Sequence, residues 1–173
     1  MEDVRGKTVL VVDDEPSVRL YLQTVLEDSG FEVQTAANGH QALDRMTEKK
    51  PDVISLDLVM PKMSGLNFFK YIQKNKERAG IPVVVVTAHA RDELGSEDFQ
   101  KIEKHRSEEC RIFTLEKPVD APTYVNTIRQ ALDLQPLGSE SEEQTALRLE
   151  VSDAIQGADR ESLRKALEIL KGS

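Results

Sequence analysis

The apolar residues of this 173-residue chain switch five times between a short continuous run and a helical spacing. The first run, residues 7–12, is rich in β-branched residues and is followed by Val18, Leu22, Val25 and Leu26 at the spacing of one helix face. Short β-branched runs are typical of strands that are buried on both sides. Their alternation with helices predicts an α/β fold, in which a parallel sheet is covered by helices on both faces.

The pattern predicts five strand–helix units. The strands are expected over residues 7–12, 31–35, 52–56, 82–87 and 111–115. The helices are expected to begin near Pro16, Gly39, Ser64, Arg91 and Pro122. The segment 91–106 is polar, so its pattern supports a helix less than the others do.

Polar side chains stand where four of these strands end. Asp13 and Asp14 follow the first strand, Asp57 follows the third, Thr87 ends the fourth and Lys117 follows the fifth. The carboxyl ends of parallel strands share one edge of the sheet, where α/β proteins bind ligands. We therefore expect these five side chains to meet in one crevice.

The chemistry of this group points to phosphoryl transfer. Three carboxylates in one crevice repel each other unless a cation lies among them, and a site of hard oxygen ligands suits Mg²⁺. A lysine ammonium and a threonine hydroxyl opposite the cation would bind a tetrahedral anion. A metal, an anion site and a carboxylate nucleophile are the parts that phosphoryl transfer requires.

Composition excludes several other classes of protein. The chain has 23 Lys and Arg against 31 Asp and Glu, and a net charge of −8 argues against direct nucleic-acid binding. Its apolar runs are too short for insertion in a membrane, and no signal peptide is visible at the N-terminus. Cys110, the single cysteine, is expected to be a buried structural thiol. These features predict a cytoplasmic location.

The composition changes after Leu134. Residues 1–134 hold the predicted α/β domain, and residues 135–139 read as a linker. Residues 140–173 show two apolar helical stripes, which predict a helical hairpin that is too small to fold securely alone.

Four motifs in order resemble the receiver domain of two-component response regulators: VVDDEPSVR, SLDLVMPKMSG, VVVVTA and LEKP. The resemblance covers about residues 5–134. It implies a flavodoxin-like sheet with strand order 2-1-3-4-5 and a domain that accepts a phosphoryl group on one aspartate.

The resemblance also implies a metal site. Asp57 would be the phosphoacceptor, and Asp14 and Asp57 would bind Mg²⁺ directly. Asp13 would hold the metal through water, and the main-chain carbonyl of Val59 would complete the protein ligands.

Other positions acquire roles in the same way. Lys117 would contact the phosphoryl oxygens, and Thr87 would hydrogen-bond them and move on activation. The Lys117–Pro118 bond is expected to be cis. Val59 and His89 would flank the path of the hydrolytic water, and the apolar valine leads us to expect slow autodephosphorylation.

Two departures from the family stand out. The stretch from Thr87 to Lys117 is longer than the family pattern by about two helical turns. Thr114 occupies the position of the usual switch aromatic, and Phe113 lies one residue earlier. Because a strand alternates its faces, these two side chains cannot both point to the switch surface.

The predicted function is a phosphorylation switch that signals by protein contact. It would catalyse only its own phosphotransfer and slow autodephosphorylation. A sensor histidine kinase or a phosphotransfer protein would be the donor; the downstream protein is not indicated, and a homodimer is left open. The alternatives are an unphosphorylated adaptor, or the receiver fragment of a longer regulator whose output domain is missing. A haloacid dehalogenase type of phosphatase fits poorly, because VVDDEPS lacks the D-x-D arrangement of that class.

Overall fold

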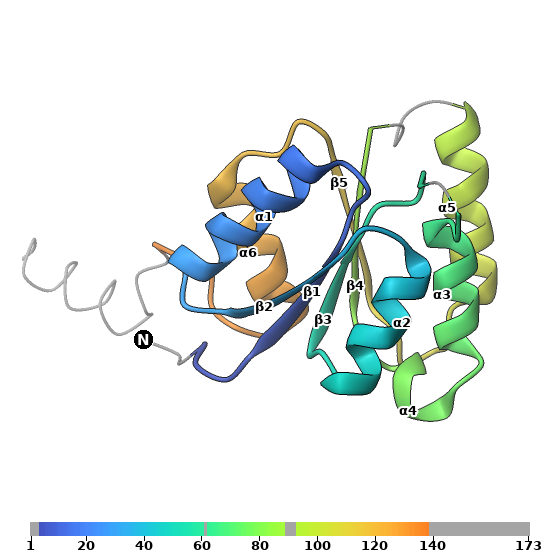
Figure 1. The fold of residues 1–173 in the computed structure, drawn as a ribbon, viewed down its shortest axis with the longest axis horizontal. Coiled ribbons are helices and arrows are strands. Elements are labelled where there is room, and N and C mark those ends of the chain that lie inside the picture. The colour runs from blue at the N-terminus through green and yellow to red at the C-terminus, as the bar shows by residue number, and fades with distance from the viewer. Residues whose placement is uncertain (1–3, 61, 89–92, 139–173) are drawn as a thin grey trace, which may run out of the picture. The chain divides into compact units, whose positions relative to one another are not determined.

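A computed structural model describes residues 4–60, 62–88 and 93–138 of the chain. The predicted hairpin over 140–173 and His89 therefore lie outside the described residues. The sheet has five parallel strands in the order β2-β1-β3-β4-β5 (Figure 1). The strands are β1 (Thr8–Val12), β2 (Glu32–Ala36), β3 (Val53–Leu56), β4 (Val83–Thr87) and β5 (Ile112–Glu116).

Helices cover both faces of the sheet, which confirms the predicted fold class. α1 and α6 lie on one face, and α2, α3 and α5 lie on the other (Figure 1). The helices are α1 (Pro16–Asp28), α2 (Gly39–Glu48), α3 (Gly65–Gln73), α4 (Lys76–Ala79), α5 (Glu93–His105) and α6 (Ala121–Ala131). None of the helices in the described ranges is both long and apolar enough to cross a membrane.

Strand alternation divides the core into two clusters. Val9 and Val11 of β1 face the side of α1 and α6, whereas Leu10 and Val12 face the side of α2 and α3. All four are at most 1% exposed, because a central parallel strand is buried on both faces. The sheet is thereby packed between two apolar layers.

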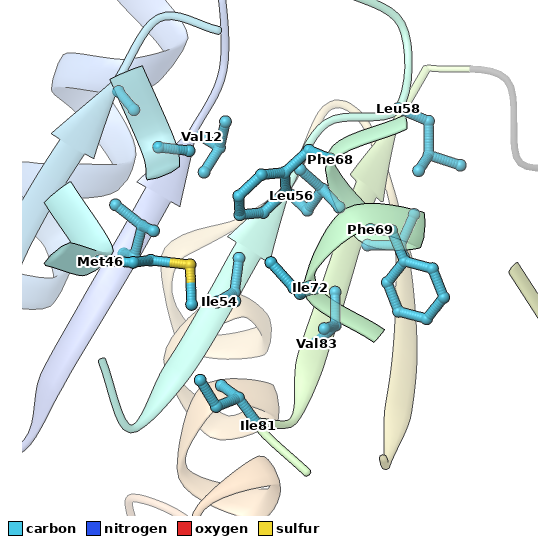
Figure 2. Packing of buried hydrophobic residues seen from close by; sticks show 14 of the residues in the cluster. Val12, Met46, Ile54, Leu56, Leu58, Phe68, Phe69, Ile72, Ile81 and Val83 are labelled. Carbon is cyan, nitrogen blue, oxygen red and sulfur yellow. The ribbon is translucent and has the colours of Figure 1, made fainter. Parts of the chain in front are cut away.

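The face of α3 that packs on the sheet is wholly apolar. Phe68, Phe69 and Ile72 are 0% exposed. Figure 2 shows Phe68 and Ile72 lying over Leu56 and Ile54 of β3. This packing fixes the helix that follows the loop after Asp57.

Local sequence sets where the helices begin. The side chains of Asn38, Ser64 and Asp120 accept hydrogen bonds from amides in the first turns of α2, α3 and α6. Glu15 precedes α1, but its side chain accepts no capping hydrogen bond. Pro16 at the first position of α1 needs no donor there.

One region differs from the sequence prediction, and a weakly patterned region agrees with it. α4 is a short helix that the apolar pattern did not predict, since four residues are too few to show a period. The polar segment after β4 does form a helix, α5, whose Ile102 is fully buried. The amide of Ser107 just beyond it donates to the Gln73 side chain at 2.7 Å, which ties the end of α5 to the end of α3.

The chain after α6 folds back along that helix. The Leu137 amide donates to Asn126 Oδ1 at 2.7 Å, and the Arg129 guanidinium donates to the carbonyl of Gln135. The Asp133 carboxylate pairs with Arg111, at the start of β5. Residues 132–137 are therefore part of the folded unit.

Candidate functional site

The strand ends bring the predicted aspartates together. The Asp13 amide donates to the carbonyl of Ala36 at 3.1 Å, and the Asp57 amide donates to the carbonyl of Val12 at 2.9 Å. These bonds extend the ladders of β1 past the strand ends. They hold Asp13 and Asp57 side by side at the carboxyl edge of the sheet.

Three carboxylates form one cluster at this edge. Asp13, Asp14 and Asp57 each offer an oxygen, and these oxygens lie within 4.8 Å of one another. Asp13 is 1% exposed and Asp57 is 6% exposed, while Asp14 is half-buried. Such proximity of buried negative charge is unfavourable without a cation.

One lysine partly compensates this charge. Nζ of Lys117 donates to Oδ2 of Asp13 at 2.7 Å and to Oδ2 of Asp57 at 3.3 Å. Burial raises the pKa of the Asp57 carboxyl above its ordinary value, although the charge of Lys117 opposes the shift. Burial alone would lower the pKa of Lys117, but its hydrogen bond to Asp13 and the charge of Asp57 raise it.

The remaining bonds orient the two buried aspartates. Oδ1 of Asp13 accepts from the Glu15 amide at 2.9 Å, and Oδ1 of Asp57 accepts from the Val59 amide at 3.2 Å. The guanidinium of Arg19 donates to the Asp13 carbonyl at 2.8 Å. Sequence reasoning did not single out Arg19, because an arginine on a helix surface carries no distinctive signal.

Thr87 and Lys117 reach the same edge from opposite sides of the sheet. The Lys117 amide donates to the carbonyl of Thr87 at 3.0 Å, so the two backbones are joined. By alternation, Thr87 belongs to the face of α3 and α5, whereas Lys117 belongs to the face of α1 and α6. Thr87 is 3% exposed. The Lys117–Pro118 bond is cis, as predicted.

Gly65 is a further residue of the site that sequence reasoning left without a role. A Cβ at this position would lie 2.0 Å from the carbonyl oxygen of Asp57 and 2.8 Å from Cα of Leu58. The Gly65 amide also donates to the carbonyl of Leu58 at 3.1 Å. The start of α3 therefore lies directly on the backbone of Asp57, at a distance that only glycine allows.

The two residues at the switch position face opposite ways, as the alternation predicted. Phe113 packs against the cluster that lies under α1 and α6. Thr114 pairs with Val85 across the sheet, shares the face of Thr87 and is exposed. No aromatic side chain of β5 therefore lies on the face of Thr87.

The cluster has the donor set of a hard divalent cation. Asp13, Asp14 and Asp57 supply carboxylate oxygens, which are ligands that Mg²⁺ prefers. The carbonyl of Val59 as a further ligand remains a prediction; the Val59 side chain is 56% exposed beside the site. The site can thus hold a cation and, next to Lys117, an anion.

Two bacterial response regulators are similar to this chain in sequence. The polar-differentiation response regulator DivK of Brucella anthropi is 33% identical over 126 residues, which cover 73% of this chain and 96% of DivK. The alkaline phosphatase synthesis transcriptional regulatory protein PhoP of Bacillus subtilis is 38% identical over 101 residues, 54% of this chain and 41% of PhoP.

A solved structure and a family model agree with these relatives. The structure of Vibrio cholerae chemotaxis protein CheY4 has a TM-score of 0.63 and 28% identity, and the match covers 73% of this chain and 98% of that one. The model of the response regulator receiver domain matches residues 9–129. The chain belongs to the response regulator receiver family.

Proposed function

We propose that this receiver domain is a phosphorylation switch whose phosphoacceptor is Asp57. The observation that carries the proposal is the cluster of Asp13, Asp14 and Asp57 within 4.8 Å, with Lys117 bound to two of its members. A buried carboxylate with one oxygen beside an ammonium is a suitable nucleophile for an electrophilic phosphorus.

The reaction forms one bond and breaks one. A carboxylate oxygen of Asp57 attacks the phosphorus of a phosphohistidine, and the P–N bond breaks as the new P–O bond forms. The imidazole leaves with the electron pair and takes up a proton. The donor is a sensor histidine kinase or a phosphotransfer protein, and small acyl phosphates serve in its place because the domain supplies most of the chemistry.

The chain's own residues position the charges. Asp14 and Asp57 would hold Mg²⁺ directly, Asp13 would hold it through water, and the carbonyl of Val59 would complete the set. Mg²⁺ bound there would supply positive charge to offset that of the transferred group. Lys117 donates hydrogen bonds to the phosphoryl oxygens.

Thr87 responds to the phosphoryl group, and hydrolysis later removes that group. Thr87 hydrogen-bonds the phosphoryl group and moves on activation. Water resets the switch slowly, because the exposed Val59 beside the site offers the water no polar group.

The signal passes by protein contact in the cytoplasm. We assign residues 1–134 to the receiver, 135–139 to a linker whose first residues are bound along α6, and 140–173 to a helical hairpin that serves as the effector or dimerisation element.

Incubation with Mg²⁺ and acetyl phosphate, followed by intact mass and size-exclusion analysis, tests this function. Wild type gains one phosphoryl group, and Asp57→Ala gains none. A change in the oligomeric size of wild type would assign dimerisation to the phosphorylated form. If neither acetyl phosphate nor any histidine kinase labels the chain, it is an unphosphorylated adaptor.

A further inference from the structure

The outer side of α3 and α4 carries a cluster of cations on an otherwise acidic chain. Lys70 and Tyr71 lie in the last turn of α3, and Lys74 is its C-cap. Lys74 is four residues from Lys70 and three from Tyr71, so its side chain lies between theirs on the outer side of the helix. The opposite face is the apolar one that packs on the sheet (Figure 2). Lys76 and Arg78 of α4 continue the series. We call these five residues the basic ridge.

None of the four cations of the basic ridge forms a salt bridge within the part of the chain that the structure describes. Most basic side chains elsewhere in that part do lie against an acid. These are Lys7, Arg45, Lys49, Lys101, Arg106, Arg111 and Lys117. Lys50, Lys62 and Lys104 form no salt bridge within the described ranges either, so the ridge stands out because four such cations follow one another on α3, its C-cap and α4.

Neighbouring acids do not cancel the field of the ridge. Helix α5 packs beside α3, but its Glu97, Asp98 and Glu103 are bound to its own Lys101 or to the nearby Arg106. Glu77 of α4 and Glu109, which lines a hollow with Lys76, are the acids at the ridge itself. Four cations against these two acids still leave local positive potential on a chain whose net charge is −8.

The ridge also has an exposed aromatic side chain at one edge. The Tyr71 side chain is 52% exposed and flanks Lys74 on the side away from Lys70. Tyrosine in a charged patch is typical of protein interfaces, where its ring packs and its hydroxyl hydrogen-bonds.

We propose that the basic ridge is a docking surface for an acidic segment of a partner protein. Lys70 and Lys74 are about 6 Å apart along the helix axis, a spacing that carboxylates four residues apart on a partner helix can match. A nucleic acid is the weaker candidate, because a long polyanion would also approach the acidic remainder of the molecule. The docking does not depend on phosphorylation of Asp57.

The test is binding of fluorescein-labelled decaglutamate to the full chain at low salt, without Mg²⁺ or a phosphodonor. Lys70→Glu/Lys74→Glu should weaken binding at least about tenfold, since attraction becomes like-charge repulsion. Tyr71→Ala should weaken it too, and salt near 0.5 M should abolish it.

The matched control is Lys49→Glu/Lys104→Glu, which changes net charge equally. Lys49 pairs with Glu32 on the edge strand β2, and Lys104 lies exposed on α5. The affinity of this control variant for decaglutamate should stay within about twofold of wild type. Circular dichroism should show that both double variants are folded. The proposal is overturned if decaglutamate does not bind wild type, if the control loses as much affinity, or if a ten-nucleotide single strand binds more tightly.

Discussion

The side chain of Lys117 hydrogen-bonds Asp13 at 2.7 Å, across 104 positions of sequence. This bond joins the loop after β5 to the end of β1 and places an ammonium over the carboxylate cluster. The same ammonium reaches Asp57 at 3.3 Å, so it is already beside the proposed nucleophile.

Lys117→Met should lower the rate of labelling by acetyl phosphate about 100-fold, the usual effect of removing one preorganised donor to a developing charge. The rate is measured by intact mass against time, with Lys104→Met on α5 as a control that should label normally. A rate within threefold of wild type would show that Lys117 does not contact the transferred group.

Asp57→Asn should raise the free energy of unfolding at pH 7 in the absence of divalent cations. Burial raises the pKa of Asp57, so the folded state binds protons more tightly than the unfolded state. Stability is therefore lost as pH rises through the window between the ordinary and the folded pKa, and the loss persists at neutral pH. Urea unfolding should show the gain at pH 7 and a smaller gain in acid.

Asp133→Asn is the control for Asp57→Asn, because the pKa of Asp133 is shifted in the opposite direction. The hydrogen bond from Arg111 lowers the pKa of Asp133, so its ionised form stabilises the fold above its ordinary pKa. This variant should lose stability at pH 7 and approach wild type in acid. Equal pH profiles for the two variants would contradict both assignments.

Gly65→Ala should destabilise the fold by about 2 kcal/mol, a usual cost of forcing a group into packed space. The added Cβ would meet the Asp57 carbonyl oxygen at 2.0 Å, so the loop that carries Asp57 must move. Labelling by acetyl phosphate should fall as well.

Gly80→Ala is the matched control for Gly65→Ala. Its Cβ would approach nothing nearer than a flexible Glu109 side-chain oxygen at 3.4 Å. If urea unfolding shows equal losses for both variants, close approach to Asp57 is not the reason for glycine at position 65.

Tyr124→Phe should leave stability unchanged or raise it by about 1 kcal/mol. The Tyr124 hydroxyl is fully buried, and within the described ranges its polar contact is with Ser55, outside normal hydrogen-bond geometry, so its desolvation is poorly compensated. Tyr21→Phe, which removes an exposed hydroxyl that donates to Val119, serves as the comparison in urea unfolding. A loss of more than about 1 kcal/mol in Tyr124→Phe would mean that Ser55 or a buried water satisfies the hydroxyl.

Val59→Asn should speed the decay of phosphorylated Asp57 by about tenfold, because an amide beside the acyl phosphate can orient the attacking water. Decay is followed by mass after removal of the phosphodonor. Val59→Ala, which adds no polar group, should decay at nearly the wild-type rate. Faster decay in Val59→Ala alone would point to steric screening by the valine.

Much of this architecture could be predicted from the sequence because parallel strands leave a strong local signal. The run at 83–86 is apolar on both faces, and the polar residues where four of the five strands end mark the functional edge. The cluster of Asp13 and Asp57 follows from strand order alone. The short α4 shows no period, and the contact between Gly65 and Asp57 depends on a loop path that no pattern encodes.

Thr87 and Lys117 stand on opposite faces of the sheet at its carboxyl edge. By alternation, Lys117 is on the face covered by α1 and α6, and Thr87 is on the face covered by α2, α3 and α5. In the function proposed above, one phosphoryl group on Asp57 contacts both residues. Phosphorylation would then change the contacts of both helical layers at once.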